Sequence, residues 1–152
     1  MYSIDFENGL VKEVKLVDIS LLKPHEKIIK KKKTSLAKFI KSYENYYIIS
    51  SIVCCDKSML IIDGHHRYFA LKELGFRKVP VTLIDYSNKS IRTGRVNPLD
   101  KNDIIKVGNS SDLLEPKSTE HAVYCDRTQL WQPIILLSSI FKIDTKDILQ
   151  KN

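Results

Sequence analysis

The sequence predicts an α/β fold in which a small sheet is flanked by helices. Its length of 152 residues is that of one domain, large enough to bury a core without disulfides or metals. Residues 59–84 read as strand, helix and strand in succession, which is the pattern of a compact β–α–β unit. The sequence contains no internal repeat and no low-complexity linker, so we predict a single domain over residues 1–152.

The N-terminal third of the chain predicts a strand, a helix and a second strand. Residues 10–22 are rich in β-branched and apolar side chains and read as extended. This strand ends at Lys23, because the residue before a proline is disfavoured in helical geometry. Apolar residues recur at helical spacing over residues 36–43, with Ser35 as the expected N-cap. Residues 47–55 are rich in Tyr, Ile and Val and read as one buried strand.

The middle of the chain gives the clearest pattern. A turn at residues 56–58 leads into a short, wholly apolar strand at residues 59–62. A helix is predicted from about His66 to Leu74, and Gly75 then occupies the left-handed position that commonly ends a helix. Residues 79–84 read as another strand, which completes the β–α–β pattern.

The pattern is weaker beyond residue 85. Residues 90–96 are compatible with a strand, residues 103–107 are too few to assign, and residues 147–151 are compatible with a terminal turn of helix. Two alternatives remain open for residues 127–141: a helix interrupted by Pro133, or an extended segment followed by a second short element.

The composition favours a soluble, cytoplasmic protein without a membrane partner. Hydrophobic residues make up 43% of the chain and charged residues 28%, as in ordinary globular proteins. The longest apolar run, residues 133–141, is too short to cross a bilayer, and the N-terminus has no apolar segment typical of a signal peptide. The three cysteines, Cys54, Cys55 and Cys125, are expected to be small buried residues in a reducing compartment.

The net charge of +7 and the pI of about 9.3 indicate an anionic partner, either a nucleic acid or a nucleotide. Four lysines, Lys30 to Lys33, are consecutive. Such a run spreads around a helix instead of lining one face, so we interpret it mainly as solvated surface, with steering of phosphates as the alternative.

The candidate site is the pentapeptide Asp63, Gly64, His65, His66 and Arg67, between the apolar strand and the helix. Ligands of α/β folds bind at this position, where the first helical turn offers free N–H groups and a positive dipole to an anion. The glycine permits close approach of the backbone, the arginine offers paired donors, and the histidines can donate to phosphate oxygens. The aspartate suggests Mg²⁺, or contact with a hydroxyl or amine.

Two other readings of these residues are possible. In the first, Asp63 only caps the helix and Arg67 pairs with a surface carboxylate, which leaves the two histidines unexplained. In the second, the four histidines bind zinc. We disfavour this site, because adjacent histidines do not share a face and the i, i+4 spacing is absent, and we assign no protein ligands to a metal. The histidines are His25, His65, His66 and His121.

Three stretches of the chain resemble the ParB/sulfiredoxin superfamily, and within it the free L-serine kinases of archaea. They are residues 22–26 (Leu-Lys-Pro-His-Glu), residues 60–86 with the pentapeptide, and, more weakly, residues 115–121. The resemblance implies a small mixed sheet with flanking helices, a core at about residues 10–98 and a C-terminal extension at about residues 99–152. Residues 122–139 have no counterpart in the family pattern.

The resemblance also implies a chemistry. Enzymes of this kind transfer a phosphoryl group from ATP or ADP, with Mg²⁺, to the hydroxyl of free L-serine, and the O-phosphoserine serves cysteine biosynthesis. Glu26 would be the catalytic base, although by itself it reads as a solvated residue after a turn. The other implied roles are catalysis by Asp63, contact with the nucleotide phosphates by Gly64, His65, His66 and Arg67, and substrate binding by Ser118, Thr119 and His121. His25 is expected to be structural.

Three alternatives compete with the kinase. A ParB-like DNA-binding or nucleotide-switch protein fits the positive charge. Such proteins usually carry a helix-turn-helix region and an arginine-rich motif in place of the pentapeptide, and neither is apparent in this sequence. Nucleic acid is therefore not the expected partner. A sulfiredoxin-like reductase needs a cysteine after the glycine, where this chain has His65. A non-catalytic sensor of a nucleotide or amino acid on the same fold is left open by the sequence.

Overall fold

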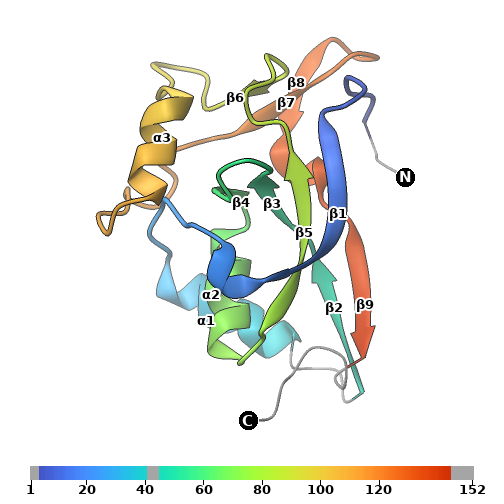
Figure 1. Cartoon of the computed structure of the whole chain (residues 1–152), viewed down its shortest axis with the longest axis vertical. Coiled ribbons are helices and arrows are strands. Elements are labelled where there is room, and N and C mark those ends of the chain that lie inside the picture. Colours follow the sequence, from blue (N-terminus) through green and yellow to red (C-terminus); the bar gives the residue numbers. More distant parts are fainter. Residues whose placement is uncertain (1–3, 41–44, 145–152) are drawn as a thin grey trace.

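The computed structural model of the chain describes residues 4–40 and 45–144, and it has the predicted α/β architecture (Figure 1). A four-stranded sheet has the order β1-β5-β3-β4, and two smaller sheets pair β2 with β9 and β6 with β7 and β8. The strands are β1 Val11–Asp18, β2 Tyr46–Ser50, β3 Ile52–Cys55, β4 Ile61–Asp63, β5 Lys78–Ile84, β6 Ile91–Arg92, β7 Ala122–Cys125, β8 Leu130–Pro133 and β9 Ile140–Asp144. The helices are α1 Lys30–Ile40, α2 His65–Glu73 and α3 Lys101–Gly108, with short 3-10 turns at Ile19–Leu21 and Ile134–Leu137.

The predicted β–α–β unit is present in a modified form. β4, α2 and β5 follow one another as expected, but β3 lies between β4 and β5 in the sheet. β3 pairs antiparallel with β4 and parallel with β5, so the parallel pair is β3 and β5, and β4 belongs to the crossover. The tight turn at residues 56–58 causes this, because it folds β4 back onto β3 through hydrogen bonds between Cys55 and both Met59 and Leu60.

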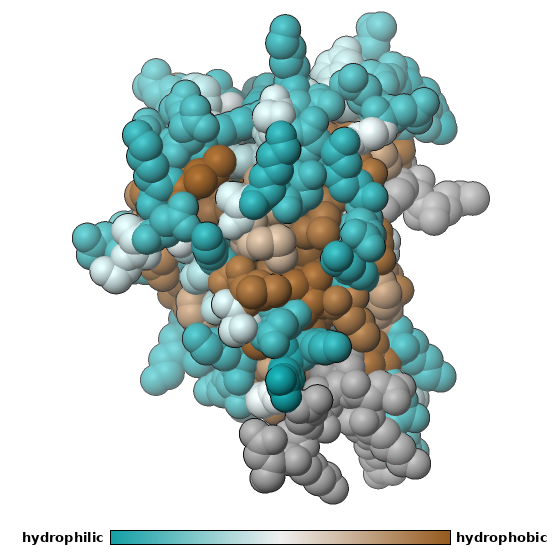
Figure 2. All heavy atoms as spheres, in the orientation of Figure 1, coloured by the Kyte–Doolittle hydropathy of each residue, from teal (hydrophilic) through white to brown (hydrophobic). Residues whose placement is uncertain are grey.

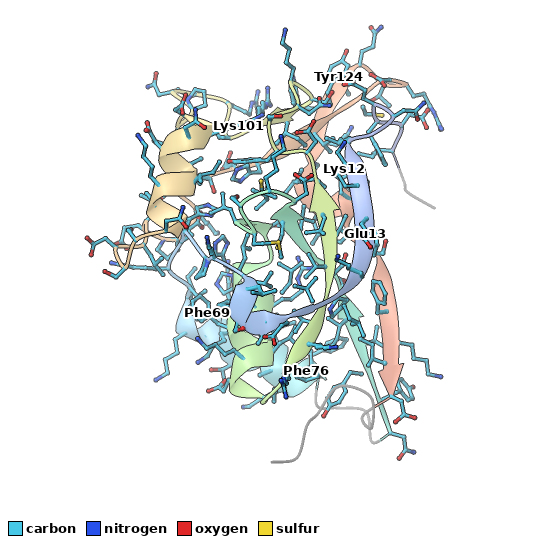
Figure 3. All side chains as sticks on the ribbon, in the orientation of Figure 1. Lys12, Glu13, Phe69, Phe76, Lys101 and Tyr124 are labelled. Atoms are coloured by element: carbon cyan, nitrogen blue, oxygen red, sulfur yellow. The ribbon has the colours of Figure 1, made fainter. Side chains whose placement is uncertain are left out.

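β3 is buried on both faces and separates two hydrophobic clusters. Its four side chains are at most 4% exposed, and burying an Ile or Val side chain contributes about 1.5–3 kcal/mol. Cys54 packs with residues of α1 and α2, whereas Cys55 packs with residues of α3, β7 and the second 3-10 turn. The two cysteines therefore face opposite sides of the sheet, and all three cysteines are buried, as predicted. Figure 3 shows Phe76 just after α2. Its ring packs edge-to-face on that of Tyr47, with the ring centroids 4.9 Å apart.

The first predicted helix begins earlier than its sequence pattern indicated. α1 starts at Lys30, so Ser35 lies inside the helix and the prediction that it caps the N-terminus is wrong. Lysine is a good helix former, and the carbonyl of Ile29 accepts hydrogen bonds from the N–H groups of Lys32 and Lys33. The predicted end at residues 41–43 lies outside the described residues.

The buried strand predicted at residues 47–55 is in fact two strands in different sheets. The chain changes sheet at Ser51, whose hydroxyl bonds to Thr82 Oγ1 at 2.7 Å and accepts from the N–H of Ser139 at 2.8 Å. β2 then pairs with β9 instead of continuing the central sheet. The break has no glycine or proline to mark it, because it depends on partners distant in sequence.

The C-terminal half resolves the open assignments. β6 spans only residues 91–92 of the possible strand at 90–96, and α3 forms where residues 103–107 alone were too few to assign. Asp100 caps α3 by accepting from the N–H of Asn102 at 2.8 Å. Residues 130–144 form β8, a 3-10 turn and β9, so the extended alternative is correct and the interrupted helix is wrong. The turn of helix considered at residues 147–151 lies outside the described residues.

Figure 2 shows an apolar area near the middle of one face, where β1, β5 and the first 3-10 turn lie. Leu16 and Leu21 are 42% and 55% exposed there and line a shallow groove with Met59 and Leu83. This groove shares no residue with the candidate site described below. Within residues 4–40 and 45–144, no helix has both the length and the apolar character needed to cross a bilayer.

Candidate active site

One cavity of about 360 Å³ gathers eight of the nine residues that the sequence singled out. Its walls come from α1, from the start of α2, from the loop at residues 115–121 and from residues 133–135. The predicted residues that line it are Glu26, Asp63, Gly64, His65, His66, Arg67, Thr119 and His121. Ser118 does not line it. It lines a neighbouring cavity, and its hydroxyl donates to the carbonyl of Glu115.

The pentapeptide is built around an ion pair between its first and last residues. β4 ends at Asp63, Gly64 is the N-cap of α2 with φ 104°, and the helix begins at His65. Arg67 donates from Nη2 to Asp63 Oδ2 at 2.9 Å, one helical turn apart. A Cβ atom on residue 64 would lie 3.1 Å from Arg67 Nη2, so the glycine makes room for the guanidinium group. Asp63 therefore holds Arg67, and the helix has no side-chain cap.

Arg67 also fixes the point where the chain changes sheet. Its Nη1 donates to the carbonyls of Ser50 at 3.1 Å and Ser51 at 2.6 Å, and its side chain is 11% exposed. Three of the five N–H donors of a guanidinium are thus used within the protein. Two donors remain for a ligand, so contact between Arg67 and a phosphate stays a prediction.

The two adjacent histidines attach the segment at residues 25–29 to α2. His65 Nε2 accepts from the backbone N–H of His25 at 3.1 Å, and His66 Nε2 accepts from that of Ile29 at 3.0 Å. Each ring therefore carries its proton on Nδ1 and keeps one donor for another partner. Burial, with the nearby histidines, holds the pKa of His65 well below its ordinary value, so this residue stays neutral.

His25, His65 and His121 form a buried cluster. The His25 ring contacts His65 edge-on, with ring centroids 4.5 Å apart, and its centroid lies 5.8 Å from that of His121. His121 Nε2 is 2.7 Å from the hydroxyl of Tyr86. His66 is outside this cluster, and among the described residues no group of three or more His, Cys, Asp or Glu side chains is placed to hold a metal ion.

The buried histidines predict a loss of stability in mild acid. Burial lowers the pKa of His25 to about 4 and that of His121 to about 3, from an ordinary 6.5. The unfolded chain therefore binds more protons than the folded chain below pH 6.5, and the free energy of unfolding falls as pH decreases. We expect a loss of about 2 kcal/mol per histidine between pH 7 and pH 5, measured by urea unfolding. The variant His121→Gln should lose part of this dependence, and equal stability of the parent at both pH values would contradict it.

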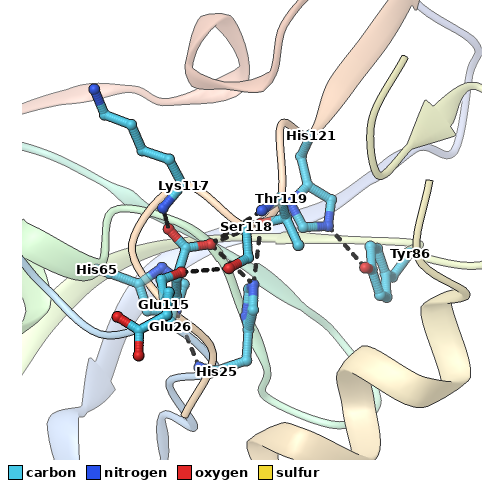
Figure 4. A network of polar contacts seen from close by, with 9 residues as sticks. All are labelled: His25, Glu26, His65, Tyr86, Glu115, Lys117, Ser118, Thr119 and His121. Carbon is cyan, nitrogen blue, oxygen red and sulfur yellow. Dashed lines mark hydrogen bonds and ion pairs between the residues drawn. The ribbon is translucent and has the colours of Figure 1, made fainter. Parts of the chain in front are cut away.

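Glu26 reaches the cavity because short backbone contacts hold its segment on both sides. Lys23 forms an isolated β-bridge with Leu60, and Glu26 forms one with Leu114. The segment therefore lies between β4 and the loop at residues 115–121. The Glu26 carboxylate accepts from the N–H of Lys117 on Oε1 and from the hydroxyl of Thr119 on Oε2 at 2.9 Å (Figure 4). Its side chain is 13% exposed, so it is not the solvated glutamate that its local sequence suggests.

Two lysines that were not among the predicted site residues also line the cavity. Lys32 comes from the first turn of α1, and Lys117 comes from the loop opposite, where it has φ 62°. The pKa of Lys32 is lowered by its contact with Lys117 and by the charge of that residue. Burial is the main cause that lowers the pKa of His66, and the charges of Lys32 and Lys117 lower it further. The sequence interpretation took the run of lysines mainly as solvated surface, and it did not predict that Lys32 lines the cavity.

The remaining wall is apolar and was also missed. Leu36, Ile62, Pro133, Ile134 and Ile135 also line the cavity. The last three belong to residues 122–139, the segment without a counterpart in the family pattern. A cavity lined by both charged and apolar side chains suits a ligand that carries both phosphate and an apolar ring.

No model of a protein family matches this chain. It is 39% identical over 80 residues to an ATP-dependent L-serine kinase of Staphylothermus marinus, over 51% of this chain and 31% of that protein. It is 32% identical over 76 residues to a ParB-like protein of Sulfolobus acidocaldarius, over 50% of this chain and 37% of that protein. An ADP-dependent L-serine kinase of Thermococcus kodakarensis is 29% identical over 96 residues, which cover 60% of this chain and 38% of that protein.

The chain thus spans about a third of the length of each of these relatives. The resemblance to archaeal L-serine kinases and to ParB-like proteins is confirmed at the level of sequence. Over half or more of its length, the chain is related to archaeal L-serine kinases and to a ParB-like protein.

Proposed function

We propose that this chain is a nucleotide-dependent phosphotransferase that phosphorylates the hydroxyl of free L-serine. The observation that carries the proposal is the single cavity in which the Glu26 carboxylate, the pentapeptide and two lysines come together. Phosphoryl transfer requires aligned reactants, neutralised phosphate charge and an acceptor for the hydroxyl proton, and this cavity offers groups for each. The similarity to two L-serine kinases supports the choice of substrate. The product, O-phosphoserine, would serve cysteine biosynthesis in the cytoplasm.

In this proposal Glu26 accepts the proton of the seryl hydroxyl as the seryl oxygen bonds to the terminal phosphorus of the nucleotide. The bond from that phosphorus to the bridging oxygen breaks, and the nucleotide leaves with one phosphate fewer. The two cavity lysines balance the charge of the phosphates, and His66 can donate a hydrogen bond from Nδ1 to a phosphate oxygen. The apolar wall at residues 133–135 offers a surface for the base of the nucleotide.

Asp63 fits a Mg²⁺ ion that arrives with the nucleotide. Magnesium is commonly held by one or two carboxylates together with substrate phosphates. Arg67 uses only Oδ2 of Asp63, which leaves Oδ1 of this cavity-lining residue for the metal. The ion would neutralise phosphate charge when bound. Asp63 has in addition the structural task of orienting Arg67.

The test is an assay of the purified chain with Mg²⁺, L-serine and either ATP or ADP, with O-phosphoserine as the measured product. Product with one nucleotide would establish the kinase and identify its donor, since the relatives include both an ATP-dependent and an ADP-dependent enzyme. Absence of product with either nucleotide, despite nucleotide binding, would overturn the proposal and favour a sensor.

A ParB-like DNA-binding or nucleotide-switch protein is the second candidate, supported by the net charge and by the ParB-like relative. Binding to duplex DNA through lysines would weaken steeply as salt increases, because counterions are released on binding. A titration of fluorescent DNA at low and physiological salt separates the cases. Negligible binding at low salt would remove this candidate.

The position of Lys32 predicts a role in nucleotide affinity. We expect Lys32→Ala to weaken ATP binding about tenfold, because the variant loses a charge-assisted hydrogen bond to a phosphate oxygen. The effect on AMP should be smaller, since AMP lacks the outer phosphates. Calorimetric titration measures both. The matched control is Lys31→Ala, which removes the same charge from an exposed lysine that does not line the cavity. Equal losses in the two variants would mean that only the overall surface charge matters.

A further inference from the structure

The hydroxyl of Thr119 lies between the Glu26 carboxylate and the ring of a buried histidine. Thr119 Oγ1 is 2.9 Å from Glu26 Oε2 and 3.2 Å from His25 Nε2 (Figure 4). The backbone N–H of Thr119 also points to Glu26 Oε2, at 3.4 Å. Thr119 was expected to bind substrate by resemblance, and His25 was expected to be structural.

The chemistry of the three groups fixes the direction of both hydrogen bonds. An ionised carboxylate only accepts, so the single proton of the Thr119 hydroxyl goes to Glu26. The hydroxyl oxygen then accepts from His25, which requires the proton of this imidazole to be on Nε2. The ring of His25 is fully buried, and burial lowers its pKa to about 4, so it is neutral at physiological pH. His25 is fixed in turn, since its backbone N–H donates to His65.

This arrangement leaves a defined position free on the carboxylate. A carboxylate has about four lone-pair sites. Thr119 occupies both sites on Oε2, and the N–H of Lys117 occupies one site on Oε1. One lone-pair site on Oε1 therefore remains for a ligand, because Glu26 lines the cavity.

We propose that Thr119 is the positioning residue of Glu26, and that His25 sets the direction of the Thr119 hydroxyl. The proposal rests on the proposed function, in which Glu26 accepts the seryl proton. His25 and Thr119 then orient the base before substrate arrives, which lowers the cost of reaching the reactive geometry. Thr119 acts through Glu26 and need not touch the substrate.

The test compares Thr119→Val, which removes the hydroxyl and keeps the shape, with Thr119→Ser, which restores it. We expect Thr119→Val to lower kcat on the order of 10²-fold, the cost of misplacing a catalytic group, with KM for L-serine within about twofold. The acidic limb of the pH profile of kcat should move to higher pH, because the charged carboxylate loses a donor. Thr119→Ser should recover most of kcat. Thr128→Val makes the same change at an exposed residue outside the cavity and should have no effect.

A second measurement does not depend on activity. Nitrogen-15 NMR of the His25 ring should show a neutral imidazole protonated on Nε2 between pH 5.5 and 8 in the parent, and a changed Nε2 shift in Thr119→Val. A ring protonated on Nδ1, or an unchanged kcat and pH profile in Thr119→Val, would overturn the assignment of Thr119. An inactive parent would overturn the proposed function instead. The NMR result would still test the hydrogen bond between His25 and Thr119.

Discussion

Replacing Glu26 with Gln is expected to lower kcat by about 10²–10⁴-fold, the usual contribution of a general base, while nucleotide affinity stays within about twofold of the parent. The amide keeps the size of the carboxylate, and its oxygen can still accept a hydrogen bond from the loop at residues 117–119. It cannot accept the seryl proton. Single-turnover formation of O-phosphoserine and calorimetric titration of the nucleotide measure the two effects separately.

The matched control for this variant is Glu115→Gln. Glu115 lies on the same loop, its side chain is 75% exposed, and it pairs with Lys27 at 2.7 Å. An exposed pair contributes little to stability, so its loss should leave turnover nearly unchanged. Equal activity of Glu26→Gln and the parent would show that Glu26 is not the base.

Replacing Gly64 with Ala is expected to damage the site more than the fold. At φ 104° an alanine is strained by about 1–3 kcal/mol, and its Cβ would lie 3.1–3.2 Å from two atoms of the Arg67 guanidinium group. Arg67 would have to shift, although three hydrogen bonds hold it against Asp63 and the sheet break. Since Asp63 is bonded to the same group, we expect kcat to fall on the order of 10²-fold.

Gly75→Ala is the control that separates strain from crowding. Gly75 has φ 87°, but a Cβ there meets no atom within 4 Å. Thermal unfolding should show a similar loss of stability in both variants, while O-phosphoserine formation and nucleotide binding should be impaired only in Gly64→Ala. Similar activity in the two variants would contradict the role assigned to the contact with Arg67.

The parts of the fold that were predicted correctly are those with local causes. The helix α2 and the strand β5 were predicted from the apolar residues within each segment, and Gly75 ends the helix because it adopts a left-handed conformation. The turn at residues 56–58 was also predicted from the sequence. Its effect on the order of the strands was not predicted, because the pairing partner of each strand is decided by contacts across the sheet.

Much of the candidate site could be named from the sequence, but its internal contacts could not. The pentapeptide stood out because it follows an apolar strand and begins a helix. Glu26 was selected only through the resemblance, since nothing in its neighbours shows that the loop at residues 114–119 covers it. Lys117 reaches the cavity for the same reason, across more than 90 residues of sequence from Glu26.

By itself, then, the sequence determined the α/β class and the helix that carries the pentapeptide, because these depend on residues close together in the chain. Only the tertiary structure decided that the chain changes sheet at Ser51, that Lys32 is the lysine of its run that faces the cavity, and that Arg67 is bonded to Asp63 and to two carbonyls. Each of these depends on partners supplied by distant segments. Hydrogen bonds and packing between such segments form only when the whole chain folds.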